Sequence, residues 1–389
     1  MLKDKVGICI VGPGFWAREM HLPAFAAMQD VKVVSLVGRC EAPTRALAEQ
    51  FGITNCSTDF AEAVKADSVD VVDILAPNYL HAPIAIAAAE AGLKLVPELK
   101  KPDALDDNAF NEQKKQATIY LNGTAAQAAM VSKDYPNAIK YYKAVLAINP
   151  DEAITEYRLG QAYLASTPPQ QLDGFWYIAR AVTSKAATQQ QSTQLKTYLR
   201  KLIVNYQQAA CDNLIDAQLN ELLQLAGSSA ERPDTYKIPS ATDLDAARKD
   251  MTIASVITDL KAGGDKSKVT WLASCGLEFP DVPGKLIEIT PGAAATDPIV
   301  LKVAFVTSDA EFQAATTPNM DVKVVGQPEA AKLEKDNPVR FTGTLTSYDP
   351  DPAFMLHWDK AKVNAEDIPQ EKEKKAPAKR PAAKKPAAK

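Results

Sequence analysis

Short apolar runs separated by helical segments dominate the first hundred residues. Runs rich in β-branched residues alternate with segments whose apolar positions follow a helical spacing, which is typical of parallel strands joined by helices. The predicted strands are 6–11, 31–37, 69–76 and 93–96, and the predicted helices include 42–51 and 83–91. This alternation predicts a doubly wound, Rossmann-like α/β domain with a parallel sheet at residues 1–105.

Alanine-rich helical periodicity replaces this alternation over residues 112–226. Ala126 and Gly160 occupy equivalent small-residue positions 34 residues apart. A 34-residue period of paired helices is typical of tetratricopeptide repeats (TPR), and residues 117–185 resemble two such units. We therefore expect an all-α repeat domain whose concave surface binds a protein or peptide partner.

The hydrophobic period changes to two from residue 269 onwards. Strands are predicted at 284–290, 299–306, 321–325, 339–345 and 354–358, separated by turns rich in Pro, Gly and Asp. They predict a small all-β barrel or sandwich at 266–365, which resembles oligonucleotide-fold modules. Residues 227–265 are predicted as a linker with one helix, and Gly263–Ser267 as a turn.

Charge and apolar content exclude several classes of function. The formal net charge is −4, but residues 371–389 hold eight Lys or Arg against two Glu, so the remainder carries about −10. An acidic body argues against nucleic-acid binding, apart from weak contact by the disordered Lys/Ala/Pro tail at 366–389. Because no apolar run approaches about 20 residues and no secretory signal is recognisable, we expect a cytoplasmic protein without a membrane span.

The cysteines follow no recognisable framework. They are scattered and odd in number, at Cys9, Cys40, Cys56, Cys211 and Cys275. No pair has the spacing of a metal site, so we expect reduced thiols and no metal centre.

The turn after the first strand carries the clearest chemical signal. Gly12 allows a tight turn, Gly14 lets a pyrophosphate approach the backbone, and the small Ala17 lets helix and strand pack closely. The helix that follows offers unpaired N–H groups and a positive dipole end to the phosphates. A dinucleotide-binding site is therefore predicted here.

Further motifs accompany this turn. They are His21-Leu-Pro-Ala24, Ala76-Pro-Asn78 with His81, and the closing Glu98-Leu-Lys-Lys-Pro102. With Gly12–Ala17, they resemble the N-terminal domain of the Gfo/Idh/MocA oxidoreductase family. The resemblance implies a nicotinamide cofactor, with Lys101 as the catalytic residue. The cofactor-binding residues that we assign are Gly12, Gly14, Phe15, Trp16, Arg39, Pro77, Asn78, His81 and Glu98.

The residue after the second strand bears on the choice of cofactor. An acidic residue there favours NAD, whereas an arginine accommodates the 2′-phosphate of NADP. Arg39 occupies the place and favours NADP over NAD. The alternative is that Arg39 is a solvated loop residue, and His81 has a comparable alternative as a residue that starts a helix.

Several functions remain open at this point. The family's second domain, with its acid/base histidine, is not recognisable after Lys101, since the next histidine is His357. We therefore expect a TPR interaction scaffold with a noncatalytic NAD(P)-binding domain. The alternative is an NADP-dependent oxidoreductase that acts on a sugar or polyol. A third hypothesis is a mosaic of a truncated oxidoreductase and an unrelated repeat protein.

Overall fold

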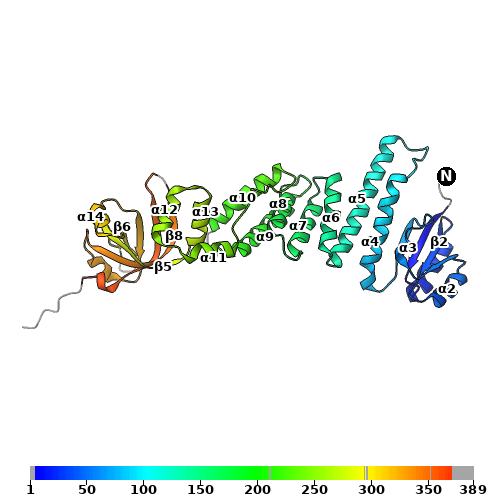
Figure 1. The fold of residues 1–389 in the computed structure, drawn as a ribbon, viewed down its shortest axis with the longest axis horizontal. Coiled ribbons are helices and arrows are strands. Elements are labelled where there is room, and N and C mark those ends of the chain that lie inside the picture. The colour runs from blue at the N-terminus through cyan, green and yellow to red at the C-terminus, as the bar shows by residue number, and fades with distance from the viewer. Residues whose placement is uncertain (1–4, 210–211, 293, 295–296, 351, 370–389) are drawn as a thin grey trace, which may run out of the picture. The chain divides into compact units, whose positions relative to one another are not determined.

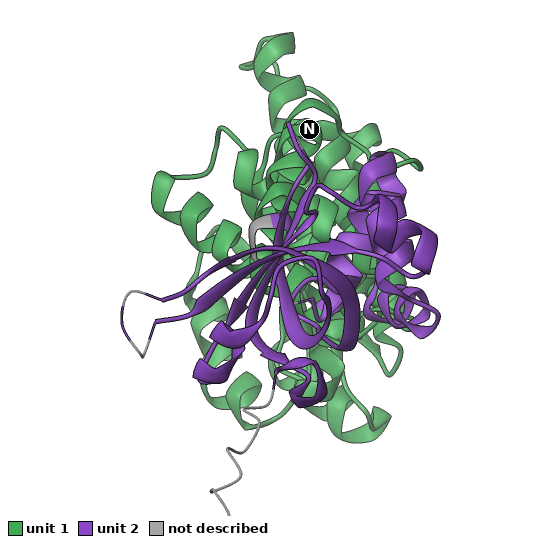
Figure 2. Ribbon diagram, turned by 90° about the vertical axis from the view of Figure 1, so that its left-hand side faces the viewer, with its two compact units in different colours: residues 1–205, 215–238 green, residues 206–214, 239–389 purple. Residues whose placement is uncertain are grey.

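The structure is a computed structural model that describes residues 5–209, 212–292, 294, 297–350 and 352–369. It divides into two compact units, residues 1–205 with 215–238 and residues 206–214 with 239–389 (Figure 2). Cys211 and the tail beyond residue 369 lie outside the described residues.

A parallel four-stranded sheet in the order β3-β2-β1-β4 begins the first unit. The elements are β1 (Val6–Val11), η1 (Ala17–His21), α1 (Leu22–Ala27), β2 (Val31–Val37), α2 (Glu41–Gln50), β3 (Asn55–Ser57), α3 (Phe60–Ala63), β4 (Val71–Ile74) and α4 (Asn78–Leu95). Ile10 of β1 and Leu36 of β2 are fully buried, because both faces of the central strands are covered. The predicted Rossmann-like α/β domain is confirmed.

Helix α4 corrects one predicted strand. Residues 93–96 do not extend the sheet, because α4 continues to Leu95 and passes into the 3₁₀ turn η2 (Val96–Glu98). Gly92 does not end the helix: a Cβ added there would lie 3.0 Å from the side chain of Leu121, so the glycine allows close packing on α5 (Asp107–Val131). The Tyr141 hydroxyl also hydrogen-bonds Glu90 of α4.

A helical region follows, as the sequence predicts (Figure 1). After α5 come α6 (Tyr135–Ile148), α7 (Ala153–Ala165), α8 (Gln171–Thr183), α9 (Gln189–Gln207) and α10 (Asp212–Ser228). Helices α5 to α8 pack each against the next, and Phe175 and Trp176 of α8 are fully buried. The helical region is confirmed, whereas its assignment to TPR repeats is not shown.

Gly160 makes a close contact between α7 and α8. A Cβ added there would lie 2.7 Å from Ile178 Cγ1 and 2.9 Å from the Gly174 carbonyl oxygen. We expect Gly160→Ala to lower the free energy of unfolding by about 1–3 kcal/mol, because the contacting backbone cannot yield. Gly123→Ala on α5 is the matched control and should raise it by about 0.5–1 kcal/mol, since that Cβ meets open space. Urea denaturation measures both, and equal stabilities would contradict the close contact.

The described residues of the second unit from 239 onwards form four α-helices and a closed barrel. Its elements are α11 (Ala241–Lys249), α12 (Ile253–Ala262), α13 (Gly264–Ser274), β5 (Glu278–Thr290), β6 (Ile299–Phe305), α14 (Asp309–Ala314), β7 (Met320–Val324), η3 (Pro328–Lys332), β8 (Pro338–Asp349), β9 (Met355–Val363) and η4 (Ala365–Asp367). The strand order is β5-β6-β7-β9-β8, and Phe341 and Trp358 meet in the core with ring centroids 5.3 Å apart. The predicted five-stranded barrel is confirmed.

Two expectations fail just before the barrel. The segment predicted as a turn contains the start of α13, because only Gly263 and Gly264 adopt positive φ, and Leu272 is then buried beside Leu244 of α11. Cys275 is disulfide-bonded, so the expectation of reduced thiols is wrong at this position. Sequence spacing gave no sign of the bond, because the folded chain decides which thiols meet. Cys9, Cys40 and Cys56 are free.

Candidate cofactor site

The glycine turn joins the carboxyl ends of three parallel strands. The Gly12 N–H donates to the Val37 carbonyl at the end of β2 (2.9 Å), and the Leu75 N–H donates to the Val11 carbonyl at the end of β1 (2.8 Å). Gly12 has φ +114°, and a Cβ there would lie 2.5 Å from the Leu75 carbonyl carbon. Only glycine fits, and the turn lies directly against the end of β4.

The turn also leaves room for a ligand. A Cβ added at Gly14 would meet no atom within 4 Å, and the helix starts directly after this residue. The Arg18 N–H donates to the Gly14 carbonyl (3.1 Å), so the N–H groups of the preceding turn point out of the helix end. Phe15 and Trp16 expose 62% and 63% of their surface beside this opening.

Gly38 brings the loop after β2 against this turn. A Cβ at Gly38 would lie 2.6 Å from Pro13 Cγ and 2.1 Å from the hydroxyl of the buried Thr44. The exposed Arg39 follows immediately, at the place where the sequence predicts the adenosine ribose. Arg45 instead binds Glu41 of its own helix (2.6 Å).

The end of β4 supplies the second group of predicted residues. Pro77 precedes α4, whose first turn carries Asn78 and His81. The His81 ring nitrogen Nε2 lies 2.7 Å from the Ala76 carbonyl oxygen. The structure thus brings His81 to the same strand-end edge as the glycine turn, where open α/β sheets bind ligands.

Glu98 and Lys101, from the motif that closes the domain, lie apart from the strand-end residues described above. Lys101 is exposed and pairs with Asp107 at the start of α5 (2.5 Å), and Glu98 lies exposed in η2. Among the described residues, no hydrogen bond or ion pair joins either side chain to the glycine turn. Their roles stay predictions.

Sequence reasoning missed a polar pair behind the turn. His21 Nδ1 lies 2.7 Å from the Asp73 carboxylate, which projects from β4. This pair ties the helix after the turn to the strand on the other side of the site. Asp73 is one of two acidic residues in the mostly apolar run 69–76, and its position inside a predicted strand was the signal that could have revealed the pair.

A groove opens next to His81. It has a volume of about 860 Å³ and is lined by the first turns of α4, one face of α5, Val145 of α6 and the start of α7. Tyr120, Val131 and Ile154, three of the most exposed large apolar side chains, lie in it. The groove belongs entirely to the first unit.

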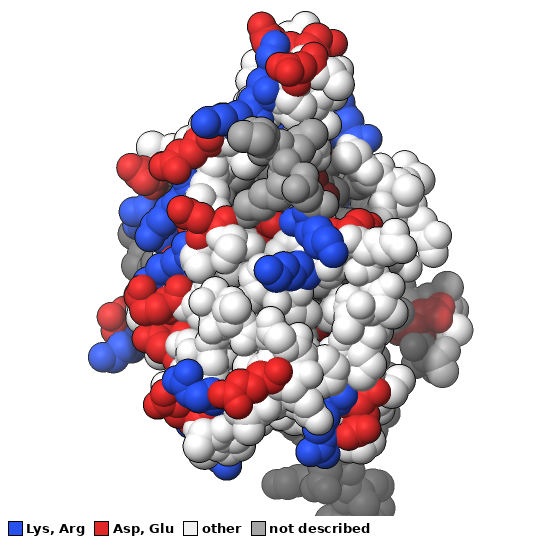
Figure 3. Space-filling view, turned by 90° about the vertical axis from the view of Figure 1, so that its right-hand side faces the viewer, with Lys and Arg blue, Asp and Glu red and all other residues white. Residues whose placement is uncertain are grey.

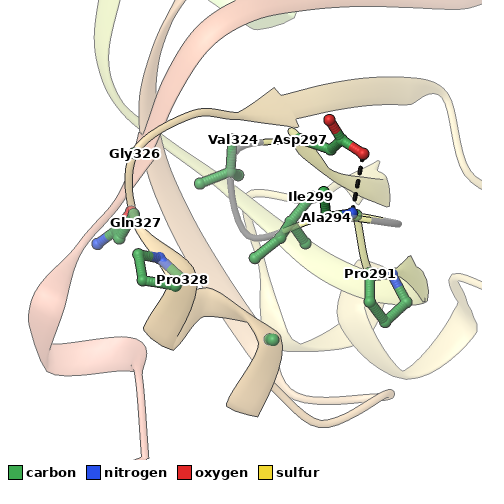
Figure 4. Close-up of a pocket in the computed structure, with 10 residues that line it drawn as sticks. Pro291, Ala294, Asp297, Ile299, Val324, Gly326, Gln327 and Pro328 are labelled. Carbon is green, nitrogen blue, oxygen red and sulfur yellow. Dashed lines mark hydrogen bonds between the residues drawn. The ribbon is translucent and has the colours of Figure 1, made fainter.

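A smaller hollow lies at the barrel. It has a volume of about 210 Å³, and Figure 4 shows Asp297, Val324 and Gln327 among the residues that line it. The Asp297 carboxylate accepts from the Ala294 N–H (2.9 Å). Its polar groups are engaged within the chain: Gln327 exchanges two hydrogen bonds with the backbone of Val363.

The structure also bears on three other features: basic patches, metal-ligand clusters and membrane-spanning helices. The face in Figure 3 intermixes acidic and basic side chains around a wide uncharged area, without a basic patch. In the described ranges no cluster of three His, Cys, Asp or Glu side chains could hold a metal ion. Across those same ranges, no helix has the length and apolar character needed to cross a membrane.

The residues present fit a dinucleotide. The turn combines a glycine that no other residue could replace, a second glycine facing open space, and a helix end that presents N–H groups. These are the three requirements of a pyrophosphate cradle.

Comparisons with known proteins agree with this geometry. Residues 6–118 match the Gfo/Idh/MocA oxidoreductase family, described as an NAD-binding Rossmann fold. The N-terminal part of this chain therefore carries a Gfo/Idh/MocA-type NAD-binding Rossmann domain.

Individual relatives are dehydrogenases. The chain is 31% identical over 111 residues (28% of this chain, 35% of the relative) to 4-carboxy-2-hydroxymuconate-6-semialdehyde dehydrogenase of Sphingobium sp.. It is 35% identical over 104 residues (24% and 26%) to levoglucosan dehydrogenase of Pseudarthrobacter phenanthrenivorans. The matched part thus spans about a third or less of these relatives' length.

Solved structures match over a similar share of the chain. Scyllo-inositol dehydrogenase from Lactobacillus casei with bound NAD(H) and scyllo-inositol aligns over 32% of this chain and 34% of that one, at 24% identity and a TM-score of 0.23. Levoglucosan dehydrogenase in complex with NADH and levoglucosan aligns over 23% and 26%, at 32% identity and a TM-score of 0.22.

These relatives correct the first functional hypothesis. The interpretation of the chain as a TPR interaction scaffold is wrong, because the proteins it resembles are dehydrogenases and the matched family is an oxidoreductase family. They favour the oxidoreductase alternative.

Proposed function

We propose that this protein is a nicotinamide-dependent dehydrogenase that interconverts an alcohol and a carbonyl compound. One observation carries the proposal: the Gly12–Gly14 turn, open at Gly14, lies directly against the end of β4, where α4 presents His81. The family match over residues 6–118 supports it.

The residues divide the chemical work between binding and proton transfer. A bound nicotinamide supplies the hydride acceptor, so that alcohol and NAD(P)⁺ give a carbonyl compound, NAD(P)H and a proton. The protein must take up the hydroxyl proton. A carbonyl oxygen only accepts, so Nε2 of His81 carries the hydrogen that faces Ala76, and Nδ1 of the neutral ring keeps a lone pair. We assign proton uptake to His81 Nδ1, since Lys101 is paired with Asp107.

The names of the relatives bear on the substrate class. Relatives are named for levoglucosan, D-apiose and scyllo-inositol, which support a sugar or polyol, but another is named for a carboxylated semialdehyde. The proposal therefore covers small molecules with a hydroxyl or carbonyl group, sugars and polyols among them.

The cofactor preference rests on Arg39. This side chain is exposed next to Gly38, which lies against Pro13 of the glycine turn. A guanidinium there would pair with a 2′-phosphate, so we propose NADP as the preferred cofactor, with NAD as the competitor.

Titration of the full chain with NADH and NADPH, by fluorescence and calorimetry, tests the proposal. We expect both to bind, NADPH about tenfold more tightly, and Arg39→Asp to reverse this preference because the carboxylate repels the phosphate. Lys201→Asp on α9 is the control and should leave both affinities unchanged. If neither cofactor bound, the proposal would be contradicted. An unchanged preference in Arg39→Asp would contradict only the role of Arg39.

A further inference from the structure

The groove beside His81 carries exposed apolar surface that the fold does not use. Tyr120 and Val131 on α5 expose 73% and 70% of their surface, and Ile154 on α7 exposes 52%. All three line the same hollow of about 860 Å³. Cavities that bind small molecules are mostly apolar, with a few polar groups that fix the orientation of the ligand.

The lining of the groove also contains a positively charged side chain, Arg158. Arg158 projects from α7 and is exposed, and within the described part of the chain it has no carboxylate partner. Glu152, the acidic residue of the groove, is already engaged: its carboxylate caps α7 by accepting from the Thr155 N–H (2.7 Å). An anionic group on a ligand would therefore find its complement at Arg158.

His81 is the residue that the groove shares with the strand-end edge of the candidate cofactor site. This side chain lines the groove, and its Nε2 lies 2.7 Å from the Ala76 carbonyl oxygen at the strand-end edge. A molecule in the groove would thus lie beside the group to which we assign proton uptake.

We infer that this groove is the substrate site, and that its occupant is a small molecule with an apolar body and one anionic group. The anionic group pairs with Arg158, the apolar body lies on Tyr120 and Ile154, and the reacting hydroxyl faces His81. This inference rests on the proposed dehydrogenase function and narrows it, because an uncharged sugar would leave Arg158 unused.

Two fluorescent probes of nearly equal shape test the charge requirement. 8-Anilinonaphthalene-1-sulfonate carries one anionic group, and N-phenyl-1-naphthylamine lacks it. We expect Arg158→Gln to weaken binding of the anionic probe to the full chain about tenfold and that of the neutral probe less than twofold. Lys201→Gln, which removes an exposed cation outside the groove, is the control and should change neither affinity.

A second variant tests the location. A side chain at Gly123 would extend into the groove without meeting any atom within 4 Å at its Cβ, so Gly123→Leu should fill the groove without lowering the melting temperature. Groove binding of both probes should be lost in this variant. Retained binding would place the probes elsewhere and overturn the inference.

Saturating NAD⁺ or NADP⁺ distinguishes failure of this inference from failure of the dehydrogenase proposal. We expect the preferred cofactor to change the affinity of the anionic probe at least twofold, because the two sites meet at His81. Cofactor binding with no change in probe affinity would make the groove a separate surface and overturn the inference, while the dehydrogenase proposal stands. Failure of both cofactors to bind would overturn both proposals.

Discussion

Gly14→Asp should weaken NADH binding about 100-fold or more while leaving the fold intact. The added side chain meets no atom within 4 Å at its Cβ, so packing does not oppose it. Its carboxylate would stand where the pyrophosphate approaches the helix N-terminus. Two like charges about 4 Å apart repel by roughly 4 kcal/mol at the effective dielectric near a protein surface.

Calorimetric titration with NADH measures this effect, and thermal unfolding checks the fold. Gly52→Asp is the control for the added charge: it adds the same charge to the same domain, at a glycine whose Cβ would also meet open space. Because Gly52 has φ +67°, this variant should lose some stability but no affinity. Its affinity for NADH should equal that of the unchanged protein. If Gly14→Asp bound NADH as tightly as Gly52→Asp, the glycine turn would not be the pyrophosphate site.

Arg180→Met should lower the free energy of unfolding by about 3–5 kcal/mol. Arg180 Nη2 lies 2.6 Å from Oε1 of Glu156, whose side chain is 1% exposed, and Arg180 also donates to the backbone of Pro150 and Ser229. Removing the guanidinium leaves a buried carboxylate without its partner. Replacing both partners in Arg180→Met/Glu156→Leu should recover most of the loss.

The pH dependence of this variant has a defined sign. Burial raises the pKa of Glu156 above its ordinary value of 4.5, and Arg180 opposes that shift. Without Arg180, the pKa of Glu156 in the folded state rises further above its value in the unfolded chain. The Arg180→Met variant therefore keeps its stability below about pH 4.5 and loses it as the pH rises and Glu156 ionises. Urea denaturation at pH 4.5 and 7.5 should show a smaller deficit at the lower pH, and an equal deficit at both would contradict the buried charge.

Local patterns made the ends of the chain predictable. Gly12 and Gly14 belong to one short turn whose requirements are local, and the barrel strands alternate with a period of two, so both were found from the sequence. Residues 93–96 were not: α4 continues to Leu95, and Gly92 just before them packs against Leu121, which is distant in sequence. Tertiary contacts of this kind override local propensity.

The site was predictable only in part for the same reason. His81 was found through a motif, but its neighbours in the groove come mainly from α5 and α7. No spacing in the sequence indicates that Tyr120 and Arg158 line the same groove. The His21–Asp73 pair likewise joins residues 52 positions apart. The disulfide at Cys275 belongs to the same class of feature, since only the fold brings thiols together.

Helix α4 makes the Rossmann domain inseparable from the helices that follow it. Its first turn presents His81, and Gly92 lies against Leu121, about 17 Å further along the same rod of 18 residues. A fragment cut after Pro102 would bare the apolar side of that rod to water and should aggregate. Grafting this cofactor domain onto another protein would therefore require α5 to travel with it.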